Sequence, residues 1–288
     1  MLNSEIVHTL TRDDVTLAGA LFLPKTKTST NISALLFFHG DGGNFYNPLY
    51  IRMGEMLSEH GITFLSANRR GHDTISSTGN PEVKGGYAFE SVSHSPLDIG
   101  AWINFLKARG HQDIAIGGHS GGAVRATYTQ STTHFENVKA LIPVSPGEYY
   151  HAGIAKLHGK KFEESFSLAE FHIAYGNPDH LMQPGIPWGS TWTATSFIDC
   201  FNRDDRYQVS QHALEIQIPT RFIFGELETT IDGPEELPVC GLARQTIEKH
   251  IGENHPQLSL SVIESANHGY AGKELSLYET IHSFIKSI

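Results

Sequence analysis

Short apolar segments alternate with longer segments of helical periodicity along most of the chain. Six apolar segments are rich in β-branched or aromatic residues, and each ends at a turn signal: 34–38, 63–67, 114–117, 140–144, 220–224 and 258–263. Helical patterns lie between them at 48–60, 96–109, 121–132, 234–251 and 273–287. Alternation of this kind is typical of βαβ units and predicts a mostly parallel central sheet flanked by helices. Two amphipathic segments, 5–10 and 15–22, predict an opening hairpin.

One long segment interrupts this rhythm. Residues 149–217 separate two predicted sheet strands by far more than the roughly 2–6 residues of a typical α/β loop. We expect a helical cap inserted after the sixth strand, over the carboxyl edge of the sheet, with 1–148 and 218–288 forming the core domain. The aromatic residues of the segment are expected mostly to hold the cap together; they include Phe162, Phe166, Phe171, Tyr175, Trp188, Trp192, Phe197, Phe201 and Tyr207.

Composition and charge narrow the class of partner. The formal net charge of -10 argues against a general nucleic-acid or membrane-surface binder, because both partners are anionic. The first residues lack the pattern of a signal peptide, and no apolar run reaches the roughly 18 residues of a membrane span. The chain has two cysteines, Cys200 and Cys240, too few for a disulfide scaffold. We therefore predict a cytoplasmic protein that acts on a small molecule.

A serine lies between two pairs of glycines just after the predicted strand 114–117. The sequence Gly118-His119-Ser120-Gly121-Gly122 fits G-x-S-x-G, and the residues that follow can continue as a helix. In that strand-turn-helix context the serine sits on a sharp turn and its hydroxyl group is presented as a nucleophile. A serine nucleophile needs a base, a group that orients the base, and donors for the oxyanion.

Two further loops supply the donors and the base. The glycine-rich loop 39–43 follows the strand 34–38, and from it we expect the Asp41 N–H to act with the Gly121 N–H as an oxyanion hole. The segment 266–270 follows the last predicted strand and contains His268, the candidate base. The order serine, acid, histidine along the chain is the order that this motif class requires.

The acid that would orient His268 is left open by the residues alone. The segment after strand 220–224 offers Glu226, Glu228 and Asp232. An acid at the carboxyl end of this strand, sheltered from water, could accept the ring N–H of the histidine.

Together these residues resemble the α/β-hydrolase superfamily over nearly the whole chain outside the insertion. The resemblance rests on the oxyanion loop 39–43, the R-G-H segment 68–73, the nucleophile elbow 118–122 and His268. In the family's commonest pattern, G-x-x-D, the acid is third after a glycine; Gly225 precedes Glu228 in that spacing, which favours Glu228 although it is a glutamate. Some members of the family instead place the acid after the sixth strand, where this chain has Glu148. The fold implied is the α/β-hydrolase fold.

The activity implied by the resemblance is attack of Ser120 on an ester-like carbonyl, with His268 as base and Glu228 as orienting acid. We expect hydrolysis of a carboxylic ester or lactone of a medium to large, largely apolar molecule. No metal or organic cofactor is implied, and the histidines show no zinc-binding spacing. The alternatives are a non-catalytic small-molecule binding protein on the same fold, and an amidase or peptidase.

Overall fold

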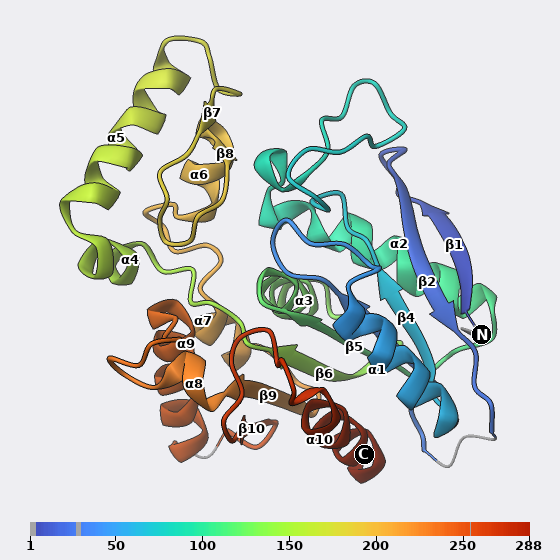
Figure 1. The fold of residues 1–288 in the computed structure, drawn as a ribbon. Coiled ribbons are helices and arrows are strands. Elements are labelled where there is room, and N and C mark those ends of the chain that lie inside the picture. Colours follow the sequence, from blue (N-terminus) through green and yellow to red (C-terminus); the bar gives the residue numbers. More distant parts are fainter. Residues whose placement is uncertain (1–3, 27–29, 254) are drawn as a thin grey trace.

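The protein is built on one mixed, mostly parallel sheet. The computed structural model describes residues 4–26, 30–253 and 255–288. The eight strands lie in the order β1-β2-β4-β3-β5-β6-β9-β10 (Figure 1). β1 pairs antiparallel with β2 and β2 with β4, and the other neighbours are parallel. The strands are β1 (Ser4–Leu10), β2 (Thr16–Phe22), β3 (Ala34–Phe38), β4 (Thr63–Ala67), β5 (Ile114–His119), β6 (Val138–Val144), β9 (Thr220–Gly225) and β10 (Leu258–Ile263).

The sequence patterns locate these strands closely. β3, β4 and β10 have the predicted bounds, and β5, β6 and β9 are longer by one or two residues. Every residue of β3, β4 and β5 is buried. Strands covered by helices on both faces read as continuous apolar runs, which is why these were recognisable.

Helices cover both faces of the sheet. α1 and α10 pack on one face, and α2 and α3 on the other. The core helices are α1 (Pro48–Glu59), α2 (Ser95–Ala108), α3 (Gly121–Thr133), α8 (Glu226–Thr229), α9 (Pro238–Gly252) and α10 (Glu274–Ser287), with 3-10 turns η1 (Tyr87–Phe89) and η2 (Val92–His94). The prediction that a helix begins at 234 was wrong, because Pro234 lies in a turn and α9 begins at Pro238. A proline suits the first position of a helix, and the sequence offers one at both places. No helix in the described ranges is long and apolar enough to cross a bilayer.

The segment after β6 forms the predicted helical insertion. It contains α4 (His151–His158), α5 (Lys160–Ala174), β7 (Leu181–Met182), β8 (Trp192–Thr193), α6 (Ala194–Cys200) and α7 (Val209–Leu214). α4, α5 and α6 extend to one side of the core, whereas α7 lies next to α9 (Figure 1). Buried aromatic rings hold the insertion together: Phe162, Phe166, Trp192, Phe197 and Phe201. The division into a core of 1–148 and 218–288 and a cap of 149–217 stays a prediction.

Candidate active site

Ser120 lies at a sharp turn between β5 and α3. Its backbone has φ 55° and ψ -124°, a conformation that a side-chain-bearing residue rarely adopts. The Ser120 N–H donates to the carbonyl oxygen of Val144, at 2.8 Å, which fixes the turn against β6. A side chain on Gly122 would overlap the carbonyl oxygen of His39, so only glycine lets α3 approach β3 this closely. The turn has the geometry predicted for a nucleophile elbow.

The glycine-rich loop 39–43 lies directly against this turn. A Cβ added to Gly40 would come within 3.1 Å of Ser120 Cβ. Neither the Asp41 N–H nor the Gly121 N–H, at the first residue of α3, has a hydrogen-bond partner within the described part of the chain. The first N–H groups of an α-helix have no partner within the helix, which is why that of Gly121 is free. Both are therefore available to a ligand at Ser120.

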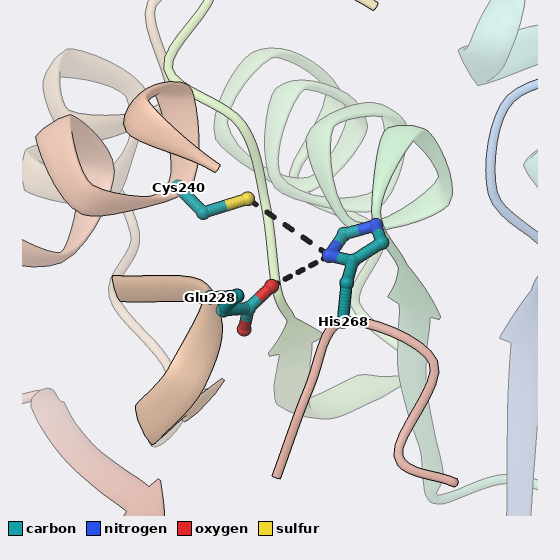
Figure 2. Close-up of side chains that lie close together, drawn as sticks. All are labelled: Glu228, Cys240 and His268. Carbon is teal, nitrogen blue, oxygen red and sulfur yellow. Dashed lines mark hydrogen bonds and ion pairs between the residues drawn. The ribbon is translucent and has the colours of Figure 1, made fainter. Parts of the chain in front are cut away.

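His268 and Glu228 form a close pair. His268 Nδ1 lies 2.5 Å from Glu228 Oε2, and Figure 2 shows the other ring nitrogen pointing away from the carboxylate. Glu228 is fully buried, and its Oε1 accepts from the Gly225 N–H at 2.7 Å and from Ser145 Oγ at 2.6 Å. Burial alone would raise the pKa of Glu228, but the hydrogen bonds from His268, Ser145 and Gly225 lower it overall. Glu228 is therefore held as an ionised carboxylate.

The other candidate acids lie elsewhere. Asp232 is exposed, and its N–H donates to Glu236 Oε2 at 2.7 Å. Glu226 accepts from the Ser265 N–H at 2.8 Å. Glu148 is buried, but its Oε1 accepts from Ser210 Oγ at 2.6 Å. Among the described residues, Glu228 is the acid that the structure brings to His268.

His119, the residue before the serine, supports the backbone of His268. Its Nε2–H donates to the carbonyl oxygen of His268 at 2.7 Å, and its Nδ1 accepts from the Tyr50 hydroxyl at 3.1 Å. The two histidine rings lie with centroids 4.7 Å apart. Burial, and then the neighbouring His268, lowers the pKa of His119 to about 3. His119 is thus a neutral hydrogen-bonding support for the loop that carries His268.

A buried ion cluster fixes the side chain of Asp41. Asp41 Oδ1 accepts from Arg69 and Arg125, each at 2.9 Å, and Oδ2 accepts from the Tyr149 hydroxyl at 2.6 Å. Glu90 pairs with both arginines. Burial would raise the pKa of Glu90, but Arg125 and Arg69 bring it down to about 2. The cluster joins the loop 39–43 to α3 and so keeps the two free N–H groups next to Ser120.

The serine turn, the loop 39–43 and His268 border one cavity of about 400 Å³. Ser120, His268, Asp41 and Gly121 all line it. The rest of its wall is largely apolar; it includes Pro187 and Trp188 from the insertion and Leu237, Pro238 and Val239 from the start of α9. Within the described part of the chain, no hydrogen bond joins Ser120 Oγ to His268. In ligand-free active sites such contacts are often long and tighten only when the substrate binds.

Comparison with known proteins supports the fold. No protein-family model matches the sequence, and no curated protein matches it. Similar solved structures include the α/β hydrolase GrgF from Penicillium sp. sh18, with TM-score 0.71, 16% identity and coverage of 99% of this chain and 98% of that one. Est1E from Butyrivibrio proteoclasticus with ferulic acid bound has TM-score 0.67, 18% identity and coverage of 97% and 98%. The Pyrococcus furiosus esterase Pf2001 has TM-score 0.62, 18% identity and coverage of 99% and 91%.

The chain therefore has the α/β-hydrolase fold, as its sequence motifs predicted. Several residues at the site had no motif to mark them. Arg125 is one helical turn after Gly121, which is a weak signal. Glu90 lies in a segment without a recognisable pattern, and Cys240 lies in a predicted helix that no motif connects with the site. Ser145 and Tyr270 form the hydrogen-bonded support of Glu228, with the two oxygens 2.7 Å apart. Only the folded arrangement brings these residues to the site.

Proposed function

We propose that the protein is a serine hydrolase that cleaves carboxylic esters or lactones. One observation carries the proposal: the strained serine, two unpartnered backbone N–H groups and His268, which is paired with the buried Glu228, border one cavity. Similarity in fold to esterases supports the same reaction class. Fold alone does not fix a function, so the argument depends on the site.

In the proposed reaction, Ser120 Oγ attacks the carbonyl carbon while His268 Nε2 takes its proton. Glu228 stays ionised and holds the Nδ1–H tautomer, which leaves Nε2 free to accept. The oxyanion accepts hydrogen bonds from the Asp41 and Gly121 N–H groups. The proton passes from Nε2 to the leaving alcohol, and the acyl group remains on Ser120. Water, deprotonated by His268, then releases the acid and restores the serine.

The wall of the cavity supports a largely apolar acyl or alcohol group. A cavity of about 400 Å³ is within the range that encloses a medium-sized organic molecule. Trp188 and Tyr149 present aromatic surface to it, with ring centroids 5.5 Å apart. Est1E, which shares the fold, was solved with an aromatic carboxylic acid bound. We infer that an aromatic or branched ester suits this cavity better than acetate.

The two other functions remain distinguishable from this one. A non-catalytic binding protein would not need the buried Glu228 that fixes one tautomer of His268. A peptidase would need a charged anchor for a peptide terminus. In the described chain, the charged side chains near Ser120 are already paired: Arg69 and Arg125 with Asp41 and Glu90.

Turnover of matched substrates tests the proposal. p-Nitrophenyl acetate, butyrate and benzoate, a lactone and the p-nitroanilide of butyric acid are offered to the wild type and to Ser120→Ala. We expect ester and lactone turnover that falls at least about 1,000-fold in the variant, since the serine acts as a unit with its base. Faster cleavage of the anilide than of the ester would favour the amidase alternative. Equal turnover by both proteins would refute a Ser120 mechanism.

A further inference from the structure

A third polar side chain lies beside the histidine–glutamate pair. Cys240 Sγ is 4.0 Å from His268 Nδ1, on the same side of the ring as the carboxylate (Figure 2). One ligand atom from each of Glu228, Cys240 and His268 lies within 4.8 Å of the others. The three residues come from separate segments: the short helix α8, the start of α9 and the loop after β10. No spacing in the sequence could therefore have indicated the cluster.

We propose that Glu228, Cys240 and His268 form a binding site for a thiophilic divalent cation such as Zn²⁺, and that occupancy of this site switches off the hydrolase. A carboxylate, a thiolate and an imidazole are the ligand types that Zn²⁺ prefers. The ion would enter through the catalytic cavity, which both Cys240 and His268 line. Its fourth coordination position can be filled by water from that cavity.

The geometry requires a modest rearrangement. With metal–ligand distances of about 2.0–2.3 Å, the ligand atoms of a tetrahedral site lie roughly 3.3–3.6 Å apart. Cys240 Sγ must therefore approach His268 Nδ1 from 4.0 Å, while Glu228 Oε2 must withdraw from 2.5 Å. Each shift is less than about 1 Å. Rotation of the His268 ring and of the Glu228 carboxylate can provide it.

The charges and protons of the proposed complex balance. A cysteine binds a metal ion as the thiolate, so the Cys240 thiol must give up its proton when the ion binds. Binding exchanges the thiol proton for the metal, so one proton is released and the two negative ligands neutralise the dication. A neutral complex avoids the cost of an uncompensated buried charge.

The same step explains why binding would stop catalysis. In the proposed mechanism the Nδ1–H of His268 is donated to the ionised Glu228, which lies 2.5 Å away. When the metal takes Nδ1, that proton moves to Nε2. Nε2 then cannot accept the proton of Ser120, and the carboxylate no longer orients the ring. The inhibitory effect rests on the proposed hydrolase function, whereas the binding itself does not.

Two measurements test the proposal separately. First, Cd²⁺ is titrated into the metal-free wild type, Cys240→Ser and the matched control Cys200→Ser, and the thiolate-to-metal charge-transfer absorbance is recorded. Cys200 is also a buried, free cysteine, so it controls for thiol content. Second, Zn²⁺ is titrated into an assay of p-nitrophenyl butyrate turnover and then removed with a chelator. Each variant is compared with its own metal-free rate, and Cys240→Ala replaces the serine variant if that variant does not fold.

We expect one Cd²⁺ per chain with a charge-transfer band in the wild type and in Cys200→Ser, and no band in Cys240→Ser. The Zn²⁺ concentration for half inhibition should rise at least about 100-fold in Cys240→Ser, the upper end of what even an outer-shell partner contributes. A missing band in the wild type, or an equal band in Cys240→Ser, overturns the site. If the protein has no turnover at all, the proposed function fails while the Cd²⁺ titration still decides the site.

Discussion

At the scale of single residues, the role proposed for Glu228 as the orienting acid is supported by the two contacts that its carboxylate makes. Glu228 is the third residue of α8, and its Oε1 returns to the Gly225 N–H that precedes the helix. A glutamate at this position commonly makes that contact, which satisfies a backbone donor left free at the start of a helix. Its Oε2 meets His268 at the same time. A shorter aspartate would have to give up one of the two contacts.

Replacement of this acid separates it from the other carboxylates. In Glu228→Gln, the amide can donate to His268 Nδ1 and so favours the wrong tautomer. We expect kcat for p-nitrophenyl butyrate to fall by about 10³–10⁴, the loss typical of such a change in a serine triad. The exposed control Asp232→Asn should retain wild-type kcat. A loss in Asp232→Asn that equals the loss in Glu228→Gln would contradict the assignment.

The sequence located Ser120, His268 and the loop 39–43, because each follows a recognisable strand within a short motif. The residues alone left the acid among several carboxylates, because helix α8 has only four residues and too little periodicity to be predicted. Only the resemblance to the G-x-x-D pattern favoured Glu228. The sequence did not indicate that Glu90 and Cys240 would lie near these residues. Their roles depend on contacts between distant segments, which hydrophobic periodicity does not encode.

At the scale of elements, the geometry of the candidate site depends on how the loop 39–43 is attached to α3. Arg125, on α3, contacts Asp41 of the loop 39–43 and Glu90 after η1. All three side chains are at least nine-tenths buried. An ion pair in that setting is costly to break, because the remaining charges stay buried without their partner.

The strands of the main sheet and the long helices were predictable from the sequence, whereas β7 and β8 were not. Each of these two strands has two residues, which is too short to show a periodicity.

Removal of the Arg125 side chain tests whether the buried ion pairs hold the loop 39–43 against α3. Arg125→Ala should lower the free energy of unfolding by about 3–5 kcal/mol, the usual loss when one partner of a buried pair is removed. Arg203→Ala, which removes an exposed pair with Glu170, should change it by less than about 1 kcal/mol. Urea unfolding followed by circular dichroism measures both. Equal stability of the two variants would mean that the buried cluster does not hold the loop.

At the scale of the whole molecule, the buried carboxyl group of Glu148 should make the free energy of unfolding depend on pH. Burial raises the pKa of Glu148 to about 7 from its usual value of 4.5, although hydrogen bonds from Ser210 oppose the shift. Its Oε2 has no hydrogen-bond partner within the described chain. Because the folded state binds this proton more tightly, the stabilisation is full below about pH 4.5 and is lost as the pH rises through about 7.

Glu148→Gln should remove this part of the pH dependence. Between pH 5 and pH 8 the wild type should lose of order 2–3 kcal/mol of unfolding free energy relative to the variant. The variant should therefore gain stability over the wild type at pH 8, because its neutral amide can still accept from Ser210. Urea midpoints at pH 5, 6, 7 and 8 measure the difference. Parallel curves for the two proteins would show that Glu148 does not titrate in this range.

The central claim is that Ser120 is an activated nucleophile, and covalent labelling tests it most directly. The wild type and Ser120→Ala are treated with a fluorophosphonate, and intact mass and peptide mass spectrometry locate the adduct. We expect one phosphonyl group on the wild type, carried by Ser120, and none on the variant. A folded wild type that remains unlabelled, or that is labelled at another residue, would contradict the account.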